Sequence, residues 1–180
     1  ASTLPLAKVR GQVSYLDQGT VPALPFVLCR EAYLTPAVRG IHSAGATYDP
    51  GMDDPRLRQA SHDDNLAKVR SLLGDPALVP DAPLRGRVGF RCIGPDRLPL
   101  VGALGDAAQP GRNERLRDLP RHPGLHALLG YASRGLIWAP LAAELLAAQL
   151  EGEPLPLESA LVQALDPARF MLGKVHNVAH

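Results

Sequence analysis

The sequence predicts an α+β fold, in which an antiparallel sheet is covered by one helix and followed by a strand-turn-helix unit near the C-terminal end. Three observations support this prediction. Short segments of alternating apolar and polar residues recur between turns rich in proline and glycine, which is typical of antiparallel strands. One amphipathic helical pattern interrupts these segments. A glycine-bounded turn later joins the last predicted strand to a strongly apolar helix.

The first strand is predicted over residues 8–16, where Val9, Val13 and Tyr15 fall on one side and polar residues on the other. Nothing in the sequence before this strand caps or covers it, so we expect the chain to be part of a larger protein. Three further short strands are predicted after a proline-rich turn. They cover residues 26–29, 32–35 and 41–48.

A helix is predicted to begin at Ser61 and to end at Gly74. Ser61 and Asp64 have the spacing of a capping box, in which two side chains satisfy the first backbone donors of a helix. Gly74 suits the left-handed conformation that commonly ends a helix. The apolar residues between them lie on one helical face: Leu66, Val69 and Leu73. We expect this face to cover the antiparallel sheet.

The second half of the chain continues with strands and loops. The strands are predicted over residues 88–93, 98–102 and 125–129. Residues 109–123 are polar and are predicted to form an exposed loop or a short helix. Four arginines of this segment form the strongest local basic cluster: Arg112, Arg115, Arg117 and Arg121. Residues 155–180 are predicted to have little regular structure except around 161–165.

The turn at residues 130–136 precedes an apolar helix that runs through residues 141–150. A turn of this kind directs several backbone N–H groups to one place, with the positive end of the helix dipole behind them. Pro140 is predicted to occupy the first helical turn, where a missing N–H costs nothing, and the helix is predicted to be buried. The turn is either an ordinary tight connection or a seat for an electron-rich cofactor or anion.

Composition restricts the classes of protein to which the chain can belong. Its 180 residues, 46% hydrophobic and 21% charged, are typical of a globular protein of about one domain, and the net charge of +1 favours no particular partner. Two cysteines without metal-ligand spacing indicate a reduced, cytoplasmic setting and no metal site. No apolar run is long enough to span a membrane. The glycine fingerprints of pyrophosphate-binding loops are absent.

Three single residues could carry chemistry, and each also has a simple structural interpretation. Arg91 lies on the polar side of its predicted strand and would either face solvent or bind a carboxylate in a cleft. Tyr33 is either a half-buried core residue or a hydrogen-bond donor in a site. Arg10 is most simply a surface charge. The basic cluster at residues 112–121 is either a solvated face or a site for phosphates.

Several short motifs occur in the order found in FAD-dependent amine oxidases that resemble glycine oxidase and D-amino acid oxidase. The segments are 10–12, 33–36, 45–48, 89–91, 96–102 and 130–140. Residues 133–136, 139–144, 153–156 and 165–170 resemble more closely the oxidase domain of bifunctional enzymes that complete 5-methylaminomethyl-2-thiouridine in tRNA. The resemblance covers nearly the whole chain.

The resemblance implies a division into a substrate-binding sheet domain (1–124), the last strand-turn-helix of an FAD-binding domain (125–152) and a C-terminal tail (153–180). Arg91 and Tyr33 would bind the substrate as catalytic residues. The cofactor-binding residues would be Ser133, Arg134, Gly135 and Leu136. The cofactor would be FAD, and an absent methyltransferase domain would use S-adenosylmethionine. The partners would be tRNA, through its wobble uridine, and the preceding segments of the same protein.

The resemblance also explains the absent glycine fingerprint, which belongs to the start of such oxidases. We therefore expect the chain alone to bind FAD weakly and to be inactive. Two alternatives stay open at this stage. One is a stand-alone glycine or amino-acid oxidase, and the other is a non-catalytic module that binds RNA or protein.

Overall fold

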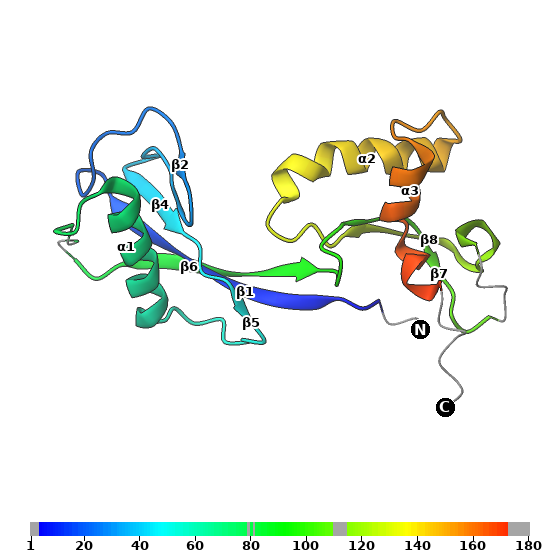
Figure 1. Ribbon diagram of the computed structural model, residues 1–180, viewed down its shortest axis with the longest axis horizontal. Coiled ribbons are helices and arrows are strands. Elements are labelled where there is room, and N and C mark those ends of the chain that lie inside the picture. Colours follow the sequence, from blue (N-terminus) through cyan, green and yellow to red (C-terminus); the bar gives the residue numbers. More distant parts are fainter. Residues whose placement is uncertain (1–3, 79, 81, 110–114, 173–180) are drawn as a thin grey trace. The chain divides into compact units, whose positions relative to one another are not determined.

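The computed structural model describes residues 4–78, 80, 82–109 and 115–172. The chain forms two compact units, which Figure 1 shows. The sheet unit comprises Lys8–Phe90, and the C-terminal unit comprises Ala1–Ala7 together with Arg91–His180. Both units combine helices with antiparallel strands, so the predicted α+β class is confirmed.

The sheet unit is built on a sheet of six strands in the order β2-β3-β4-β1-β5, with β6 also paired to β1. The long strand β1 runs antiparallel to β4, with Val13 opposite Gly45. The strands are β1 Ala7–Asp17, β2 Leu28–Cys29, β3 Tyr33–Leu34, β4 Ile41–Gly45, β5 Asp49–Pro50 and β6 Arg85–Ile93. The predicted strands are confirmed, although β2, β3 and β4 are shorter than expected and β5 was not predicted.

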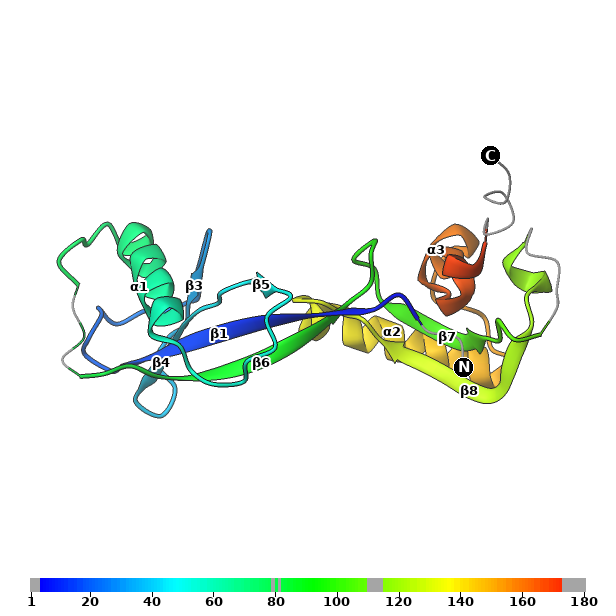
Figure 2. The same cartoon turned by 90° about the horizontal axis from the view of Figure 1, so that it is seen from below.

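Helix α1 (Gln59–Leu73) covers one face of this sheet, as Figure 2 shows. Leu16 and Leu34 of the sheet pack against Val69 of the helix in one apolar core. Gly74 ends α1 in the left-handed conformation, with φ of 67°, as predicted. The predicted start is wrong: the helix begins at Gln59, and Ser61 is a buried residue of its first turn. The Ser61 hydroxyl accepts a hydrogen bond from Arg10 at 3.3 Å and does not cap the helix.

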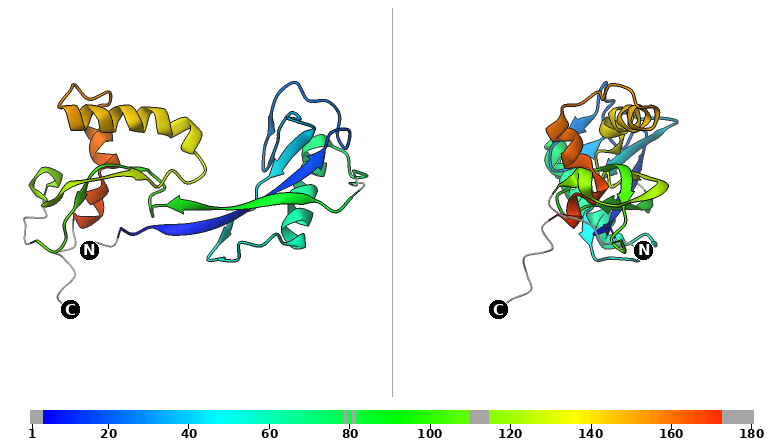
Figure 3. Two further views of the ribbon diagram at one scale, coloured as in Figure 1. Left: turned by 180° about the vertical axis from the view of Figure 1, so that it is seen from behind. Right: turned by 90° about the vertical axis from the view of Figure 1, so that its right-hand side faces the viewer.

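The C-terminal unit pairs two antiparallel strands, β7 (Leu100–Gly105) and β8 (Arg121–Leu129), with Leu100 opposite Leu129. Three of its helical segments are η1 (Leu116–Asp118), α3 (Ser159–Leu165) and η2 (Pro167–Met171). The fourth is α2 (Gly135–Glu151), which packs with α3 and with Val101 of β7 in one apolar core. Figure 3 shows α2 in yellow near the orange α3. The segment 155–172 is therefore more regular than predicted, and residues 173–180 lie outside the described part of the chain.

Helix α2 differs from its prediction in two respects. It begins at Gly135, so Pro140 lies inside the helix rather than in its first turn and removes one internal donor. Only one face is buried, through Ala142, Leu145 and Ala148, whereas Leu136 is 98% exposed. Helix α2 therefore carries more apolar surface than the C-terminal unit by itself covers. Among the described helices, none is long and apolar enough to cross a membrane.

Candidate functional site

The turn between β8 and α2 depends on residues in the left-handed conformation. Gly130 has φ of 83°, and a Cβ atom there would lie 2.9 Å from Leu100 Cδ1. Ala132 has φ of 54°, which is unusual for a residue with a side chain. The Ala132 N–H donates to Cys92 O at 3.0 Å, and Tyr131 bridges to Ile93. The end of β6 therefore holds the turn in place.

The first residues of α2 present backbone donors that this unit does not use. The Arg134 N–H donates to Tyr131 O at 3.0 Å, and the Arg134 guanidinium donates to Arg97 O at 2.9 Å. Within the part of the chain that the structure describes, the N–H groups of Ser133, Gly135 and Leu136 have no acceptor. These donors lie at the positive end of a 17-residue helix, an arrangement that attracts an electron-rich group.

Tyr131 adds a polar group that the sequence analysis did not single out. Its hydroxyl is buried, and it has no hydrogen-bond partner among the described residues. Burial raises the pKa of Tyr131 above its ordinary value, so the hydroxyl stays a neutral donor. A buried hydroxyl without a partner is costly, so this polar group of the turn is left unsatisfied among the described residues. The only sequence signal was an aromatic residue between Gly130 and Ala132.

The two predicted catalytic residues lie in different compact units. Arg91 is a half-buried residue of β6 and belongs to the C-terminal unit. Tyr33 is a half-buried residue of β3 in the sheet unit, opposite Gly45 of β4. Its neighbour Leu34 is fully buried in the core under α1, so Tyr33 faces the opposite side of the sheet. The roles of Arg91 and Tyr33 stay predictions.

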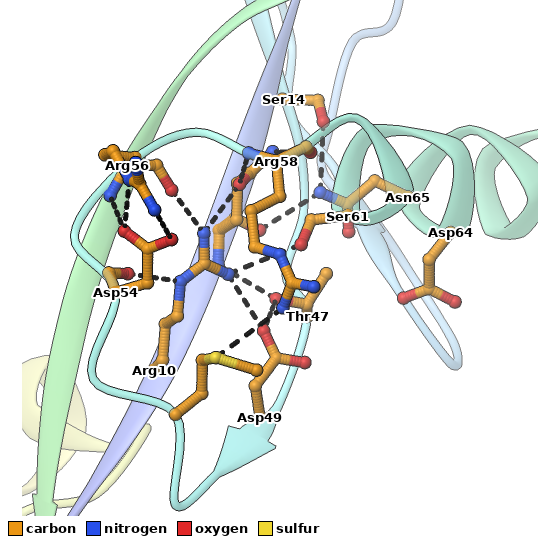
Figure 4. A network of polar contacts seen from close by, with 12 residues as sticks. Arg10, Ser14, Thr47, Asp49, Asp54, Arg56, Arg58, Ser61, Asp64 and Asn65 are labelled. Carbon is orange, nitrogen blue, oxygen red and sulfur yellow. Dashed lines mark hydrogen bonds and ion pairs between the residues drawn. The ribbon is translucent and has the colours of Figure 1, made fainter.

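Arg10 is completely buried, and its prediction as a surface charge is wrong. Its guanidinium donates to Asp49 Oδ2 at 2.9 Å, to Ser61 Oγ at 3.3 Å and to Gln12 Oε1 at 2.9 Å. It also donates to the backbone oxygens of residues 54 and 56 (Figure 4). All five N–H groups of the guanidinium therefore donate within the protein. Arg10 fixes the segment 49–58 against β1 and has no free donor for a ligand.

The polar network of Arg10 continues under α1. Gln12 accepts from the Arg58 N–H at 2.9 Å and donates to the Arg58 oxygen at 3.0 Å. Asn65 donates to Gln12 O and to Ser14 Oγ, both at 3.0 Å. Ser14 in turn contacts His62 Nδ1 at 2.7 Å, and burial lowers the pKa of His62. The network is therefore a structural device that joins α1 to β1.

The described residues contain no cluster of histidine, cysteine, aspartate or glutamate that could hold a metal ion. Among the features described above, the turn before α2 therefore offers the clearest place for a bound group.

Residues 1–149 match the family described as FAD dependent oxidoreductase (DAO). The chain belongs to this family. It is 51% identical over 173 residues to the tRNA 5-methylaminomethyl-2-thiouridine biosynthesis bifunctional protein MnmC of Azoarcus sp. (strain BH72). It is 49% identical over 178 residues to the protein of that name from Burkholderia thailandensis. These matches cover 96% and 93% of the chain but only 27% of each relative, so the chain spans about a quarter of their length.

Solved structures agree with the fold. Glycine oxidase from Geobacillus kaustophilus matches 89% of the chain with a TM-score of 0.67 and 22% identity. Iminodiacetate oxidase from Chelativorans sp. matches 92% of the chain, also with a TM-score of 0.67, at 23% identity. The matches cover 39% and 40% of those chains, respectively. The predicted family and fold are thus confirmed, and FAD is the cofactor of the family.

Proposed function

We propose that this chain is the C-terminal part of an FAD-dependent oxidase that acts on tRNA. The reaction would convert 5-carboxymethylaminomethyl-2-thiouridine at the wobble position to 5-aminomethyl-2-thiouridine. The observation that carries this proposal is the identity of about 50% to bifunctional proteins of 5-methylaminomethyl-2-thiouridine biosynthesis over nearly the whole chain. The fold of amine oxidases and the unused donors before α2 agree with it.

The turn before α2 fits the electron-rich edge of a flavin ring. Ser133, Gly135 and Leu136 each offer an unused N–H among the described residues, and the left-handed Gly130 lets the turn pack closely on Leu100. FAD would supply the acceptor for the hydride removed from the substrate. The backbone donors and the dipole of α2 would stabilise the negative charge that develops there. The Arg134 N–H would contribute less than the other three, because it already donates to Tyr131 O.

The substrate arm is a glycine joined to a base through its nitrogen, so it carries a carboxylate and a secondary amine. Arg91 would bind the carboxylate in a bidentate manner and hold the C–H bond in position for oxidation. Tyr33 would donate a further hydrogen bond. Oxidation of the amine gives an imine, and water then cleaves the C=N bond into glyoxylate and the primary amine. No nucleophile of the protein is needed.

The other partners of the proposal lie outside this chain. The relatives are named as bifunctional proteins, which implies a second activity. We propose that the complete protein has a methyltransferase domain that uses S-adenosylmethionine to methylate the freed amine. The domain division at residues 124 and 152 and a cytoplasmic location belong to the same proposal. The domain division and the location depend on no described residue other than those discussed above.

Two measurements test the proposal. The complete enzyme, purified with its bound flavin, should release glyoxylate from tRNA that carries the carboxymethylaminomethyl group. A colourless protein that takes up no FAD would refute the oxidase assignment. The chain alone should bind FAD weakly in isothermal titration and should have no activity, because the pyrophosphate-binding fingerprint is absent from its sequence. Submicromolar binding by the chain alone would contradict that expectation.

A further inference from the structure

A basic hollow of about 560 Å³ lies in the C-terminal unit where η1, β8 and α3 meet. Three arginines line it: Arg115, Arg117 and Arg121. Asp166 is the one acidic residue in its lining, and Gln163 of α3 is a further polar group there. The chain as a whole carries a net charge of only +1, so this concentration of guanidinium groups is a local feature.

Arg121 lies in the wall of the basic hollow, where its hydrogen bonds connect the surrounding elements. Its guanidinium makes a bidentate pair with Asp166, at 2.7 and 2.9 Å, and also donates to the oxygens of Ala103 and Leu116, both at 2.9 Å. These contacts connect β7, β8, η1 and the start of η2. Arg121 is therefore committed to structure, and Asp166 is neutralised by it. The remaining charge of the hollow comes from the two other arginines.

Arg115 and Arg117 are available for a ligand. Arg115 is exposed, and among the described residues its guanidinium has no hydrogen bond or ion pair. Among the described residues, Arg117 is paired only with its neighbour Asp118, at 3.7 Å and with 74% of the arginine side chain exposed. An ion pair of this kind is weak and exchanges readily for a stronger acceptor. The two side chains thus offer planar donor groups, which match the oxygens of a phosphate.

We propose that the basic hollow binds backbone phosphates of the tRNA substrate, with Arg115 and Arg117 as the contacts and Arg121 as their support. This inference rests on the proposed function, which makes RNA the macromolecule that the enzyme must hold. Phosphate contacts fix the position of a nucleic acid without reading its sequence. The hollow would add affinity for any tRNA and would take no part in oxidation.

The test uses the complete enzyme in which Arg115 and Arg117 are both replaced by glutamine. We expect the slope of log binding constant against log salt concentration to fall by about 2, since each lost phosphate contact removes about 1. At low salt, KM for tRNA should rise about tenfold, whereas kcat at saturating tRNA and the flavin spectrum should be unchanged. Replacement of both arginines by lysine should restore most of the slope.

The matched control is Lys68→Gln, which removes one positive charge from an exposed helical pair with Asp64 in the sheet unit. This variant should keep the salt slope and KM of the unchanged enzyme. An unchanged slope in the double arginine variant, or an equal change per charge in the Lys68 variant, would overturn the proposal. Loss of inhibition by inorganic phosphate without a change in the tRNA slope would indicate a small-anion site and also overturn it.

Failure of the proposed function has a different signature. In that case the unchanged enzyme would not oxidise the tRNA at all. If only the proposal for the basic hollow fails, the enzyme still oxidises the tRNA, and the arginine variants have the same salt slope as the unchanged enzyme.

Discussion

The sheet unit and the C-terminal unit differ in how far their buried or fixed polar groups find hydrogen-bond partners within the unit. In the sheet unit, Arg10 is completely buried and all of its donors have acceptors within the unit. In the C-terminal unit, the N–H groups of Ser133, Gly135 and Leu136 and the Tyr131 hydroxyl have no partner among the described residues. A closed network stabilises a fold, whereas unused donors in a fixed turn are available to a ligand.

Burial of an arginine is therefore not by itself a sign of a binding site. Arg10 would attract attention as a fully buried charge in strand β1, but its five hydrogen bonds leave no donor for a ligand. Asn65 Oδ1 is the one side-chain acceptor of this network that is buried without a partner in the described chain. The open donors of the C-terminal unit are a better indication of function.

The largest effect is expected from Arg10→Met, which tests whether the network of the sheet unit is structural. The change removes the charged partner of Asp49, which keeps a hydrogen bond from the Thr47 hydroxyl, and the Arg10 donors of two backbone oxygens, so the free energy of unfolding should fall by about 3–5 kcal/mol. Urea unfolding of the complete enzyme measures this loss. The control is Arg56→Ala, because the Arg56 side chain is 83% exposed and, in the part of the chain that the structure describes, pairs only with Asp54. Equal losses in the two variants would remove the distinction between the buried and the exposed arginine.

Arg91→Ala tests whether an arginine of the C-terminal unit acts on the substrate instead. We expect a higher KM for tRNA and a loss of about 2–5 kcal/mol of transition-state binding, the usual scale for one charged partner of a carboxylate. Steady-state kinetics of the complete enzyme give this value from kcat/KM. Urea unfolding in parallel should show a smaller loss of stability than in Arg10→Met. An unchanged kcat/KM would exclude Arg91 from the site.

Gly130→Ala tests the turn before α2. The left-handed φ of 83° and the 2.9 Å approach to Leu100 Cδ1 should together cost about 1–2 kcal/mol and displace the donors, so FAD affinity should fall. Gly152→Ala is the matched control, since Gly152 has φ of 70° but no atom within 4 Å of an added Cβ. It should lose stability alone. Titration of the apoenzyme with FAD distinguishes the two variants, and equal FAD affinities would show that the turn does not hold the cofactor.

The smallest effect concerns pH and the Asp96–Arg169 pair of the C-terminal unit. The hydrogen bond from Arg169 lowers the pKa of Asp96 below its ordinary value. A lowered pKa stabilises the folded state above the unfolded pKa, and this contribution disappears as pH falls through the folded pKa. Because Asp96 is 35% exposed, the contribution should stay below about 1 kcal/mol.

Thermal unfolding of the enzyme and of Asp96→Asn measures this contribution. Their difference should shrink as the pH falls from 5 towards 3, and a difference that is constant with pH would show that the pair has no such linkage.

The sequence predicted the parts of the fold that depend on local patterns. The alternation in β1, the glycine end of α1 at Gly74 and the turn before α2 all follow from neighbouring residues. The burial of Arg10 could not be predicted in this way. Its partners Asp49 and Ser61 lie 39 and 51 positions away and meet it only after the sheet and α1 have formed.

The same limit applies to the candidate site. The glycine-rich turn indicated a seat for an electron-rich group, but which N–H groups remain unused depends on the contacts of Arg134 and Ala132 with other segments. The apolar pattern of α2 indicated a buried helix, and the C-terminal unit covers only one of its faces. Tyr131 was missed because its unpartnered hydroxyl is a property of its surroundings.

The most direct test of the proposed function is turnover of tRNA that carries 5-carboxymethylaminomethyl-2-thiouridine by the complete, flavin-loaded enzyme. Mass spectrometry of the nucleosides should show conversion to 5-aminomethyl-2-thiouridine, with one glyoxylate released for each nucleoside converted and with bleaching of the flavin when no electron acceptor is present. A flavin-loaded enzyme that leaves this nucleoside unchanged, yet oxidises free glycine or another small amine, would contradict the assignment to tRNA.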